Sequence, residues 1–290
     1  MLKVLESGFW TSIQDRGRYD YRGYGVPVSG WMDSYSAEFA NIILGNKEGT
    51  ALMELTMTGP SLQFDSPTSI AIVGADMQPS IHGTPVLHNK VIDIKANDIL
   101  KFHAAKIGVR CYLAIKEGFK SETVLGSRSF YEGITEQARI KKGDVIPYQT
   151  ATKSMSPPLA KLKFKDDYFH QSLLEVFPGP DYDMLSQELK NELRNTEFKI
   201  SGLNNRMAYQ FENLISNSLD NMITGPVIPG TVQLTPSGRL IALMKDCQTT
   251  GGYPRVLQLT QKAMNALSQK AAGKSVNFRL KGFNCKNNNI

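Results

Sequence analysis

The sequence predicts a mainly β protein with a few helices, in which two halves form barrels or sandwiches. Short runs of branched and aromatic residues, most of them bounded by Gly, Pro, Asn or Asp, follow one another along the chain. Only three segments place apolar residues at the spacing of a helix. Many short strands and few helices are typical of barrels and sandwiches rather than of alternating βαβ units.

The expected strands share a high content of branched and aromatic residues and a length of a few residues. They are Ser69–Ala75, Val91–Ile94, Ile99–Phe102, Val109–Ile115, Leu173–Phe177, Thr231–Leu234 and Leu240–Met244.

Three helices are expected from apolar residues that recur every three or four positions. The first begins after Asp33, whose carboxylate can cap it, and ends at Gly45. The second begins near Asp183, where leucines are spaced by four. The third begins at about Leu259 and stops before Gly273.

A polar stretch without periodicity, residues 149–167, is typical of a linker and contains Pro157–Pro158. It predicts two domains of similar size, residues 1–150 and residues 151–280. Residues 281–290 end in an asparagine-rich segment, and we expect them to form a flexible tail.

The chain of 290 residues has a formal net charge of +6 and a pI near 9.1. Its lysines and arginines are scattered, and the sequence contains neither a basic stripe interleaved with aromatics nor a nucleic-acid-binding motif. We therefore expect no nucleic-acid partner. The positive charge suits the attraction of anionic small molecules or of an acidic partner protein.

The three cysteines and four histidines show no metal-ligand spacing, so we expect no metal site within the chain. Residues 1–10 lack the basic start and the apolar stretch of a signal peptide. No apolar run reaches the length that spans a membrane. These features predict a cytoplasmic protein that makes no contact with membranes.

The first candidate site is a glycine-rich stretch from Gln14 to Asp33. So much glycine implies tight turns and a close approach of the backbone to a ligand. Asp15, Arg18 and Arg22 supply charge among these turns. Exposed amides and arginines suit a carboxylate or a phosphate, because arginine offers paired donors. A loop held together by an Asp–Arg pair explains the same residues equally well.

Two shorter polar clusters each carry an arginine. Gly126–Ser129 follows the apolar pair Val124–Leu125, and a Gly-Ser pair followed by arginine can form an anion-binding nest. A serine-rich turn with a solvated arginine is an equally good interpretation. The cluster Asn204–Met207 contains Arg206 as its only charged residue, and no partner for it lies nearby in the sequence.

The fourth cluster, Asp246–Arg255, follows the expected strand Leu240–Met244. A carboxylate, an amide, two threonines, two glycines and a tyrosine lie within ten residues, and such a loop can present hydroxyls and amides to a developing oxyanion. It lacks the Walker A spacing. A hairpin turn is the alternative, since Gly-Gly is frequent in hairpins. Cys247 has no histidine in its cluster, so we interpret it as a packing residue.

Taken together, these segments resemble the allophanate hydrolase subunit 2 family, also called the KipA or biotin-dependent carboxyltransferase-like family. The resemblance extends over most of the chain and follows the order of the family's motifs. The matching segments are SIQDRGRYDYRGYGVPVSGWMD, ANIILGN, MELTMTGP, VLGSRS, NRM, PGTVQLTPSG and DCQTTGGYPR.

The resemblance implies two cyclophilin-like β-barrel domains and a partner similar to allophanate hydrolase subunit 1. It further implies the role of the third component of a bacterial 5-oxoprolinase, which converts 5-oxoproline to L-glutamate with ATP. The partners would be a KipI-like protein, similar to allophanate hydrolase subunit 1, and a LamB/YcsF-like protein. ATP, with Mg²⁺, would then be required by the complex as a whole.

The family leaves two alternatives open. In urea amidolyase, the equivalents of subunits 1 and 2 are fused in one chain, and this pair transfers a carboxyl group from biotin to urea. The present sequence contains no recognisable biotin-carrier domain. Some family members are instead described as antagonists of a histidine-kinase inhibitor, in which case the chain only sequesters a KipI-like partner.

The chain departs from the family at three positions. Asn205 and Ala208 stand where the family commonly has Asp and Gly, and Thr224 stands where a serine is frequent. With an amide at position 205, Arg206 lacks the carboxylate neighbour that is usual in the family.

The implied reaction suggests roles for the four clusters. Opening a lactam near neutral pH requires activation, and transfer of a phosphoryl group to the amide oxygen requires cations around the spreading charge. The catalytic candidates are Asp15, Arg18, Arg128 and Asp246. The substrate-binding candidates are Gln14, Ser127, Arg206, Gln248, Thr249, Thr250, Gly251, Gly252 and Tyr253.

Overall fold

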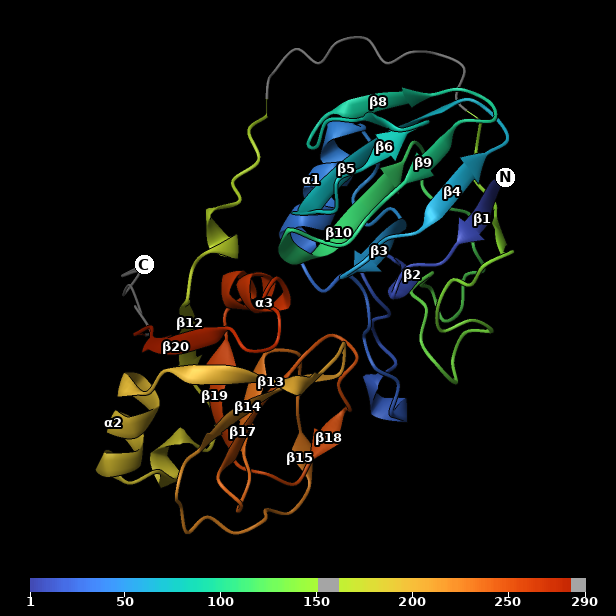
Figure 1. The fold of residues 1–290 in the computed structure, drawn as a ribbon. Coiled ribbons are helices and arrows are strands. Elements are labelled where there is room, and N and C mark those ends of the chain that lie inside the picture. The colour runs from blue at the N-terminus through green and yellow to red at the C-terminus, as the bar shows by residue number, and fades with distance from the viewer. Residues whose placement is uncertain (151–161, 283–290) are drawn as a thin grey trace, which may run out of the picture. The chain divides into compact units, whose positions relative to one another are not determined.

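A computed structural model describes residues 1–150 and 162–282, and its contacts divide the chain into two compact units (Figure 1). Unit 1 consists of Met1–Arg22 and Val28–Phe169. Unit 2 consists of Gly23–Pro27 and the residues from His170 onward. The Pro157–Pro158 part of the expected linker and nearly all of the expected tail lie outside the described residues.

The described part of unit 1 consists of two antiparallel sheets with the orders β11-β1-β4-β9-β6-β7 and β2-β3-β10-β5-β8. The strands of the first sheet are β1 (Leu2–Glu6), β4 (Ser61–Phe64), β6 (Ser80–Ile81), β7 (Thr84–Pro85), β9 (Ile99–Lys101) and β11 (Val145–Ile146). Those of the second are β2 (Trp10–Gln14), β3 (Leu52–Thr56), β5 (Thr68–Asp76), β8 (Val91–Ile94) and β10 (Ile107–Ile115).

The second sheet of unit 1 is covered on both faces. In β10, Leu113 and Ile115 belong to the main hydrophobic core, whereas Tyr112 and Ala114 pack in a second cluster beneath helix α1 (Ser34–Ile43). Successive side chains of a strand point to opposite faces, so a strand buried on both sides reads as one continuous apolar run. This explains why β10 was evident from its sequence.

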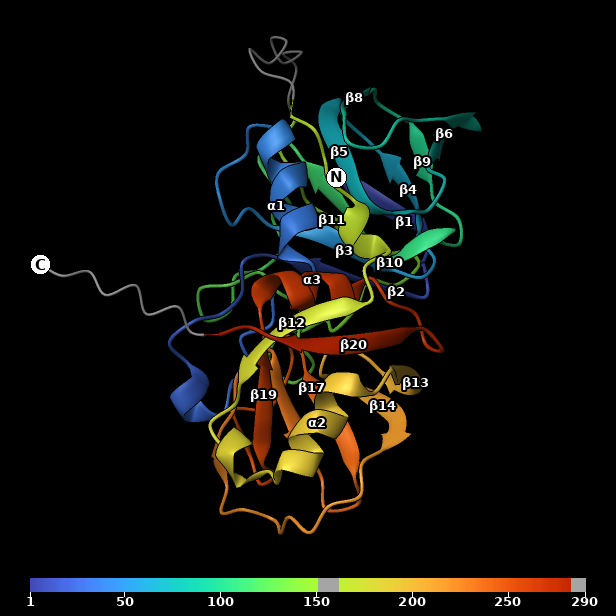
Figure 2. The same cartoon turned by 90° about the vertical axis from the view of Figure 1, so that its left-hand side faces the viewer.

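Helix α1 begins and ends as its sequence predicts (Figure 2). The Asp33 side chain accepts a hydrogen bond from the Ser36 amide at 3.2 Å, and Gly45 follows the helix with φ +60°, a conformation that glycine adopts without strain. Phe164 and Tyr168 pack against aromatic residues of α1, and for this reason unit 1 extends to Phe169.

Unit 2 is a closed β-barrel with the strand order β12-β19-β16-β17-β14-β13-β20. Its core includes Phe198, Phe211 and Phe278, whose ring centroids lie 5.3 to 5.9 Å apart. The strands are β12 (Leu173–Pro178), β13 (Phe198–Asn204), β14 (Ala208–Leu214), β16 (Thr231–Leu234), β17 (Arg239–Leu243), β19 (Arg255–Leu259) and β20 (Ser275–Leu280). A separate pair consists of β15 (Gly225–Pro226) and β18 (Thr250–Gly251).

The helices of unit 2 are α2 (Gln187–Asn195) and α3 (Gln261–Ser268) in the part that the structure describes. The predicted start of the second helix near Asp183 was wrong. Asp183 lies in a short 3₁₀ turn, and the α-helix begins only after Ser186, whose hydroxyl caps the Leu189 amide at 3.2 Å. Short 3₁₀ turns also occupy Arg22–Tyr24 and Asp167–Phe169.

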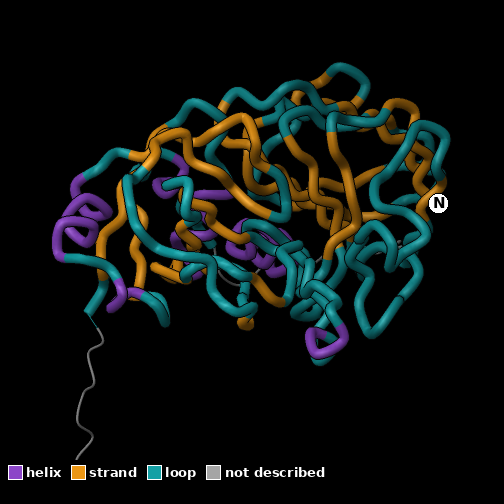
Figure 3. Tube along the Cα trace, turned by 90° about the horizontal axis from the view of Figure 1, so that it is seen from below, coloured by secondary structure: helices purple, strands orange, loops and turns teal. Residues whose placement is uncertain are grey.

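The predicted fold class, mainly β with a few helices, is confirmed (Figure 3). Each of the seven predicted strands is present, with bounds that differ by at most two residues. None of the helices within residues 1–150 and 162–282 combines the length and the apolarity that a bilayer crossing requires.

Candidate functional site

The Asp15 carboxylate, directly after β2, is the centre of a hydrogen-bonded cradle in unit 1. Its Oδ1 accepts hydrogen bonds from the hydroxyls of Ser127 at 2.6 Å and Ser129 at 2.7 Å, and from the Gly17 amide at 2.9 Å. Its Oδ2 accepts from the Arg128 amide at 2.6 Å. The sequence suggested that the Gly126–Ser129 turn receives an external anion, but the anion that this turn binds is Asp15.

The turn that carries Arg128 has a specific backbone geometry. Val124 and Ser127 exchange backbone hydrogen bonds of 2.8 and 3.2 Å across Leu125 and Gly126, whose φ angles are +50° and +76°. Positive φ at both central residues defines a type I′ turn, for which glycine is favoured. The turn therefore fixes the backbone of Arg128 from one side while Asp15 fixes it from the other.

Arg18, a predicted catalytic residue, supports this turn from within the protein. Its side chain is buried, Nη2 donates to the Ser129 carbonyl at 2.7 Å, and Nε donates to the Val124 carbonyl at 3.3 Å. Arg18 and Asp15 thus hold the same turn through different atoms, since Arg18 donates to its carbonyls and Asp15 accepts from its hydroxyls and amide. These contacts give Arg18 a positioning role.

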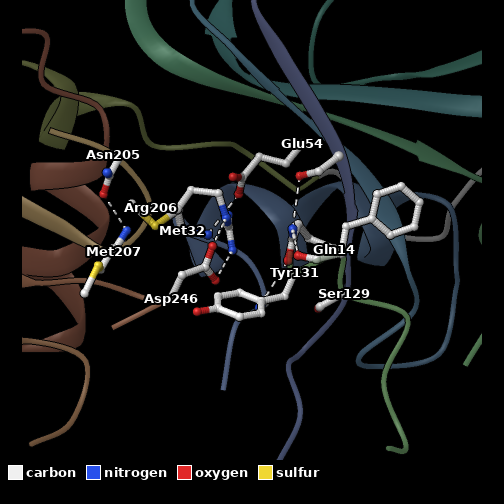
Figure 4. A network of polar contacts seen from close by, with 12 residues as sticks. Gln14, Met32, Glu54, Ser129, Tyr131, Asn205, Arg206, Met207 and Asp246 are labelled. Carbon is white, nitrogen blue, oxygen red and sulfur yellow. Dashed lines mark hydrogen bonds and ion pairs between the residues drawn. The ribbon is translucent and has the colours of Figure 1, made fainter. Parts of the chain in front are cut away.

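Gln14, a predicted substrate-binding residue, is buried and its carboxamide is used within unit 1 (Figure 4). Oε1 accepts from the Gly30 amide at 3.1 Å, and Nε2 donates to the Ser12 hydroxyl at 3.0 Å and the Phe130 carbonyl at 3.3 Å. These contacts tie β2 to two neighbouring loops. The geometry assigns Gln14 to the framework of the site.

A pocket of about 320 Å³ opens beside the cradle in unit 1. Its lining includes Asp15, Lys47, Thr50, Lys120, Thr123 and Arg128. Of these, Asp15 and Arg128 were predicted. Lys47 and Lys120 were missed although each lies in a short polar stretch with glycine, because nothing in either stretch connects it with the other and only the fold brings them to the same cavity.

In unit 2, Arg206 and Asp246 form a bidentate ion pair (Figure 4). Arg206 Nε lies 2.8 Å from Asp246 Oδ2, and Nη2 lies 3.1 Å from Oδ1. The Asp246 amide also donates to the Arg206 carbonyl at 2.9 Å. The sequence offered no nearby partner for Arg206, since the partner lies 40 positions away. Paired donors fix the plane of a guanidinium, so Asp246 orients Arg206.

Asn205 retains a clear structural role despite its departure from the family. Its Oδ1 accepts hydrogen bonds from the amides of Met207 at 2.8 Å and Ala208 at 3.1 Å, which makes an Asx-type turn. An amide oxygen serves this purpose as a carboxylate oxygen does. The substitution therefore leaves the turn that presents Arg206 intact.

The Thr-Thr-Gly-Gly segment is part of a small sheet in which Thr250 and Gly251 pair with Pro226 and Gly225. The Thr249 carbonyl accepts from the Val227 amide at 3.0 Å. Neither the Thr249 nor the Thr250 hydroxyl has a hydrogen-bond partner among the described residues. These two hydroxyls therefore remain free for a ligand. Strands β17 and β19, on either side of the segment, each pair with β16 and not with one another, so the segment is not a simple hairpin turn.

The residues around this segment are tightly packed. A Cβ on Gly251 would lie 2.6 Å from Gln233 Nε2, which donates to the Tyr253 carbonyl at 3.1 Å.

Gln248 Oε1 is buried without a hydrogen-bond donor among the residues that the structure describes. Tyr253 keeps 38% of its surface exposed, and the Gly252 carbonyl accepts from the amide of Met222.

Cys247 is buried in a small apolar cluster with Val227 and Leu243, in keeping with a packing role. Buried apolar surroundings disfavour the thiolate form, which is the reactive one. The structure therefore agrees with the prediction that this cysteine packs rather than reacts.

A second ion pair, which the sequence did not suggest, supports the same region of unit 2. Arg255 Nε and its backbone amide both lie 2.8 Å from Asp181 Oδ2, and Nη1 donates to the Pro226 carbonyl at 3.1 Å. The hydrogen bonds from Arg255 hold the pKa of Asp181 below its usual range, and the same pair raises the pKa of Arg255. Arg255 thereby links the turn after β12 to strand β15.

This pair predicts a pH-dependent stability. Because the folded-state pKa of Asp181 is depressed, its contribution is present above the ordinary pKa of 3.8 and is lost as the pH falls through the folded value. Asp181→Asn is expected to lower the free energy of unfolding by about 1–2 kcal/mol at pH 7. Denaturant titrations of both proteins between pH 2 and pH 7 test this. A difference that persists undiminished at the lowest pH contradicts the assignment.

A buried network in unit 1 was likewise not expected from the sequence. Glu54 Oε2 accepts from the Met32 amide at 2.9 Å (Figure 4). It also accepts from the Tyr112 hydroxyl at 2.9 Å. Arg110 Nε lies 3.8 Å from Glu54 Oε1. Burial and the neighbouring carboxylates raise the pKa of Tyr112, so its hydroxyl stays protonated and can donate. The Tyr112 oxygen in turn accepts from the Asp33 amide at 2.7 Å.

Among the described residues, no group of three or more His, Cys, Asp or Glu side chains is arranged to hold a metal ion.

Comparison with known proteins shows what the chain resembles. It is 28% identical over 285 residues to the 5-oxoprolinase C-subunit protein of Escherichia coli, and the match covers 96% of this chain and 90% of that protein. The protein of the same name from Haemophilus influenzae is 29% identical over 289 residues, with the same coverage. Urea amidolyase of Lachancea kluyveri is 38% identical over 149 residues, 50% of this chain and 8% of that protein.

The fold agrees with these similarities. The crystal structure of the Kluyveromyces lactis urea amidolyase superposes with a TM-score of 0.83 at 25% identity, over 96% of this chain but only 18% of that one. The chain thus spans a small part of the amidolyases. The family model described as carboxyltransferase domain, subdomain A and B, matches residues 24–280. The chain therefore belongs to this carboxyltransferase domain family, as the motifs predicted.

Proposed function

We propose that the chain is the C subunit of an ATP-dependent 5-oxoprolinase, which converts 5-oxoproline to L-glutamate together with two partner proteins. The observation that carries the proposal is similarity along nearly the whole length of two relatives. Both bear the name of the 5-oxoprolinase C subunit, and they align over 96% of this chain and 90% of their own. The match to the amidolyases, by contrast, covers a small part of those proteins.

The site geometry supports an anionic reactant. 5-Oxoproline carries a carboxylate, and ATP carries phosphates, so both reactants need cationic donors. Arg128 in unit 1 and Arg206 in unit 2 are each held in place, one through its backbone by Asp15 and the other through its guanidinium by Asp246. The Arg206 guanidinium, which Asp246 fixes, can stabilise developing charge without reorganising during the reaction, whereas Arg128 has only its backbone fixed.

The chemistry that we propose has three steps. The γ-phosphoryl group of ATP moves to the lactam oxygen as ADP leaves. A first water then adds to the lactam carbonyl carbon and the ring C–N bond breaks, with a proton passing to the nitrogen, which leaves γ-glutamyl phosphate. A second water hydrolyses this acyl phosphate to L-glutamate and phosphate. Cations around the phosphoryl group offset its charge during transfer. The Thr249 and Thr250 hydroxyls and the Gly251–Gly252 amides are the proposed contacts to the lactam.

The test is reconstitution with a KipI-like partner and a LamB/YcsF-like partner in the presence of Mg²⁺. We expect ATP hydrolysis that depends on 5-oxoproline, with one glutamate released for each ATP consumed. Omission of this chain should abolish the dependence of ATP hydrolysis on 5-oxoproline. ATP hydrolysis that ignores 5-oxoproline, in a complex that assembles, contradicts the proposal. As ATP and 5-oxoproline are intracellular metabolites, a cytoplasmic complex is part of the proposal.

A carboxyltransferase acting on urea is the second candidate, because the amidolyase of Lachancea kluyveri has the higher identity, 38%, over half of this chain. Biotin would enter only under this alternative. The two functions are separated by supplying a biotin-carrier protein whose carboxyl group is isotopically labelled and by following that label into urea. Transfer of the label, without 5-oxoproline-dependent ATP hydrolysis, favours the carboxyltransferase.

A further inference from the structure

We infer that the pocket of unit 1 binds the phosphate chain of a nucleotide, with Lys47, Lys120 and Arg128 as its cationic contacts. The inference deepens the proposed function and rests on it for the identity of the nucleotide. The three cations come from three separate segments of the chain, yet they line one cavity. A convergence of this kind forms a site for a ligand with several negative charges.

The cations of the pocket retain free donors. Neither the Arg128 guanidinium nor the Lys47 ammonium makes a hydrogen bond or ion pair with any described residue. Lys120 Nζ donates to the Glu117 carbonyl. This leaves two of its three N–H donors for a ligand. The pocket therefore presents donors that the protein itself does not use.

The two carboxylates of the lining do not cancel this charge. The Asp15 oxygens already accept the four hydrogen bonds described above, from Gly17 and the 127–129 turn. Glu117 Oε1 lies 3.7 Å from Lys116 Nζ, a cation that is not part of the lining. Asp15 is thus stabilised by neutral donors and Glu117 by a lysine outside the lining. Three cations against two carboxylates leave the lining with a formal charge of +1.

The walls of the pocket are fixed before any ligand binds. The Phe119 amide donates to the Ala51 carbonyl at 3.2 Å, and Asn46 Oδ1 accepts from the Glu117 amide at 3.0 Å. Gly118 has φ +73°, and a Cβ there would lie 2.3 Å from Thr50 Cγ2. Only glycine lets these two segments approach so closely. A preformed site binds with little loss of conformational entropy.

The size of the pocket favours a phosphate chain over a single carboxylate. A volume of about 320 Å³ is at the lower end of ordinary small-molecule sites. A carboxylate has two oxygens and one charge, which cannot satisfy a guanidinium and two ammonium groups at once. A triphosphate offers oxygens and charge to all three. The Thr50 and Thr123 hydroxyls add neutral polar contacts to the lining.

Titration calorimetry of the full chain with ATP and with tripolyphosphate tests the inference. We expect ATP and tripolyphosphate to compete for one site, and the affinity for both should fall as the salt concentration rises. Lys47→Met, Lys120→Met and Arg128→Gln should each weaken binding by about tenfold, since each removes a charge-assisted contact. Lys95→Met, an exposed lysine outside the lining, is the matched control and should bind as the wild type does.

Thr123 provides a test that a folding defect cannot imitate. Its side chain is exposed, lines the pocket and has no hydrogen-bond partner among the described residues. Thr123→Glu should weaken ATP binding and Thr123→Lys should strengthen it, each by about threefold to tenfold. A damaged fold would weaken binding in both variants. Equal affinities for both variants overturn the inference.

The remaining outcomes are also decisive. Absence of tripolyphosphate binding to the wild type at low salt overturns the pocket assignment. A site that tripolyphosphate occupies but ATP does not, or one from which 5-oxoproline displaces the ligand, overturns the nucleotide assignment. If the reconstituted complex fails to hydrolyse 5-oxoproline while ATP binding still depends on Lys47 and Thr123, the inference stands and the proposed function falls.

Discussion

Arg128→Ala is expected to lower the turnover of the reconstituted complex by about 10²- to 10³-fold, as the loss of one donor to developing charge does in other enzymes. The turn itself should survive, because Asp15 holds Arg128 through its backbone amide and the guanidinium makes no hydrogen bond or ion pair with the described residues. The measurement is 5-oxoproline-dependent glutamate release, together with the thermal unfolding midpoint of the isolated chain.

Arg279→Ala is the matched control for this prediction. Arg279 is an exposed arginine of unit 2 that pairs with Glu175 at 2.8 Å. Exposed ion pairs contribute about 0–1 kcal/mol to stability, so this variant should retain full turnover. Should Arg128→Ala keep its turnover within twofold of the wild type, Arg128 is not a contact of the reacting groups.

Glu54→Ala is expected to lower the free energy of unfolding by about 3–5 kcal/mol, since it removes one partner of a buried charged network. The side chains of Glu54 and Arg110 are only 1% and 3% exposed. The change also leaves the Met32 amide and the Tyr112 hydroxyl without their acceptor. Urea titration of the purified chain measures the effect.

Glu6→Ala controls for the loss of a glutamate from unit 1. Glu6 pairs with Lys101 at 3.5 Å on the surface, where both side chains are about half exposed or more. We expect a loss of less than about 1 kcal/mol. If Glu54→Ala lowers the free energy of unfolding no more than Glu6→Ala does, the buried network does not contribute to the stability of the chain.

The long apolar strands β5 and β10 were easier to predict than strands that polar residues interrupt. Strands β5 and β10 are apolar along most of their length because both of their faces are covered. By contrast, β2 has the sequence WTSIQ and β14 the sequence AYQFENL, and their polar residues interrupt any apolar run. Pairing with distant strands, which no local pattern records, stabilises such segments.

The predicted clusters contain residues that are hydrogen-bonded to one another in the structure, but the sequence did not show which atoms connect them. Asp15 and Arg128 were both expected among the catalytic residues, and in the structure Asp15 accepts a hydrogen bond from the backbone amide of Arg128. The partnership of Arg206 with Asp246 depends on the pairing of two segments far apart in sequence. Lys47 stands among ordinary surface residues, and only its place in the pocket distinguishes it. Roles that arise from tertiary contacts are not encoded in any short segment.

Strand β10 is shared by two hydrophobic clusters, with Leu113 on one side and Tyr112 on the other. Separation of β10 from its neighbours β3 and β5 breaks one ladder of backbone hydrogen bonds and exposes both clusters at once. The main core and the layer beneath α1 should accordingly open as one cooperative element rather than as two independent ones. The network of Glu54, Arg110 and Tyr112 is attached to this strand, as is the loop that follows Met32. Both should therefore resist local opening as strongly as the strand does.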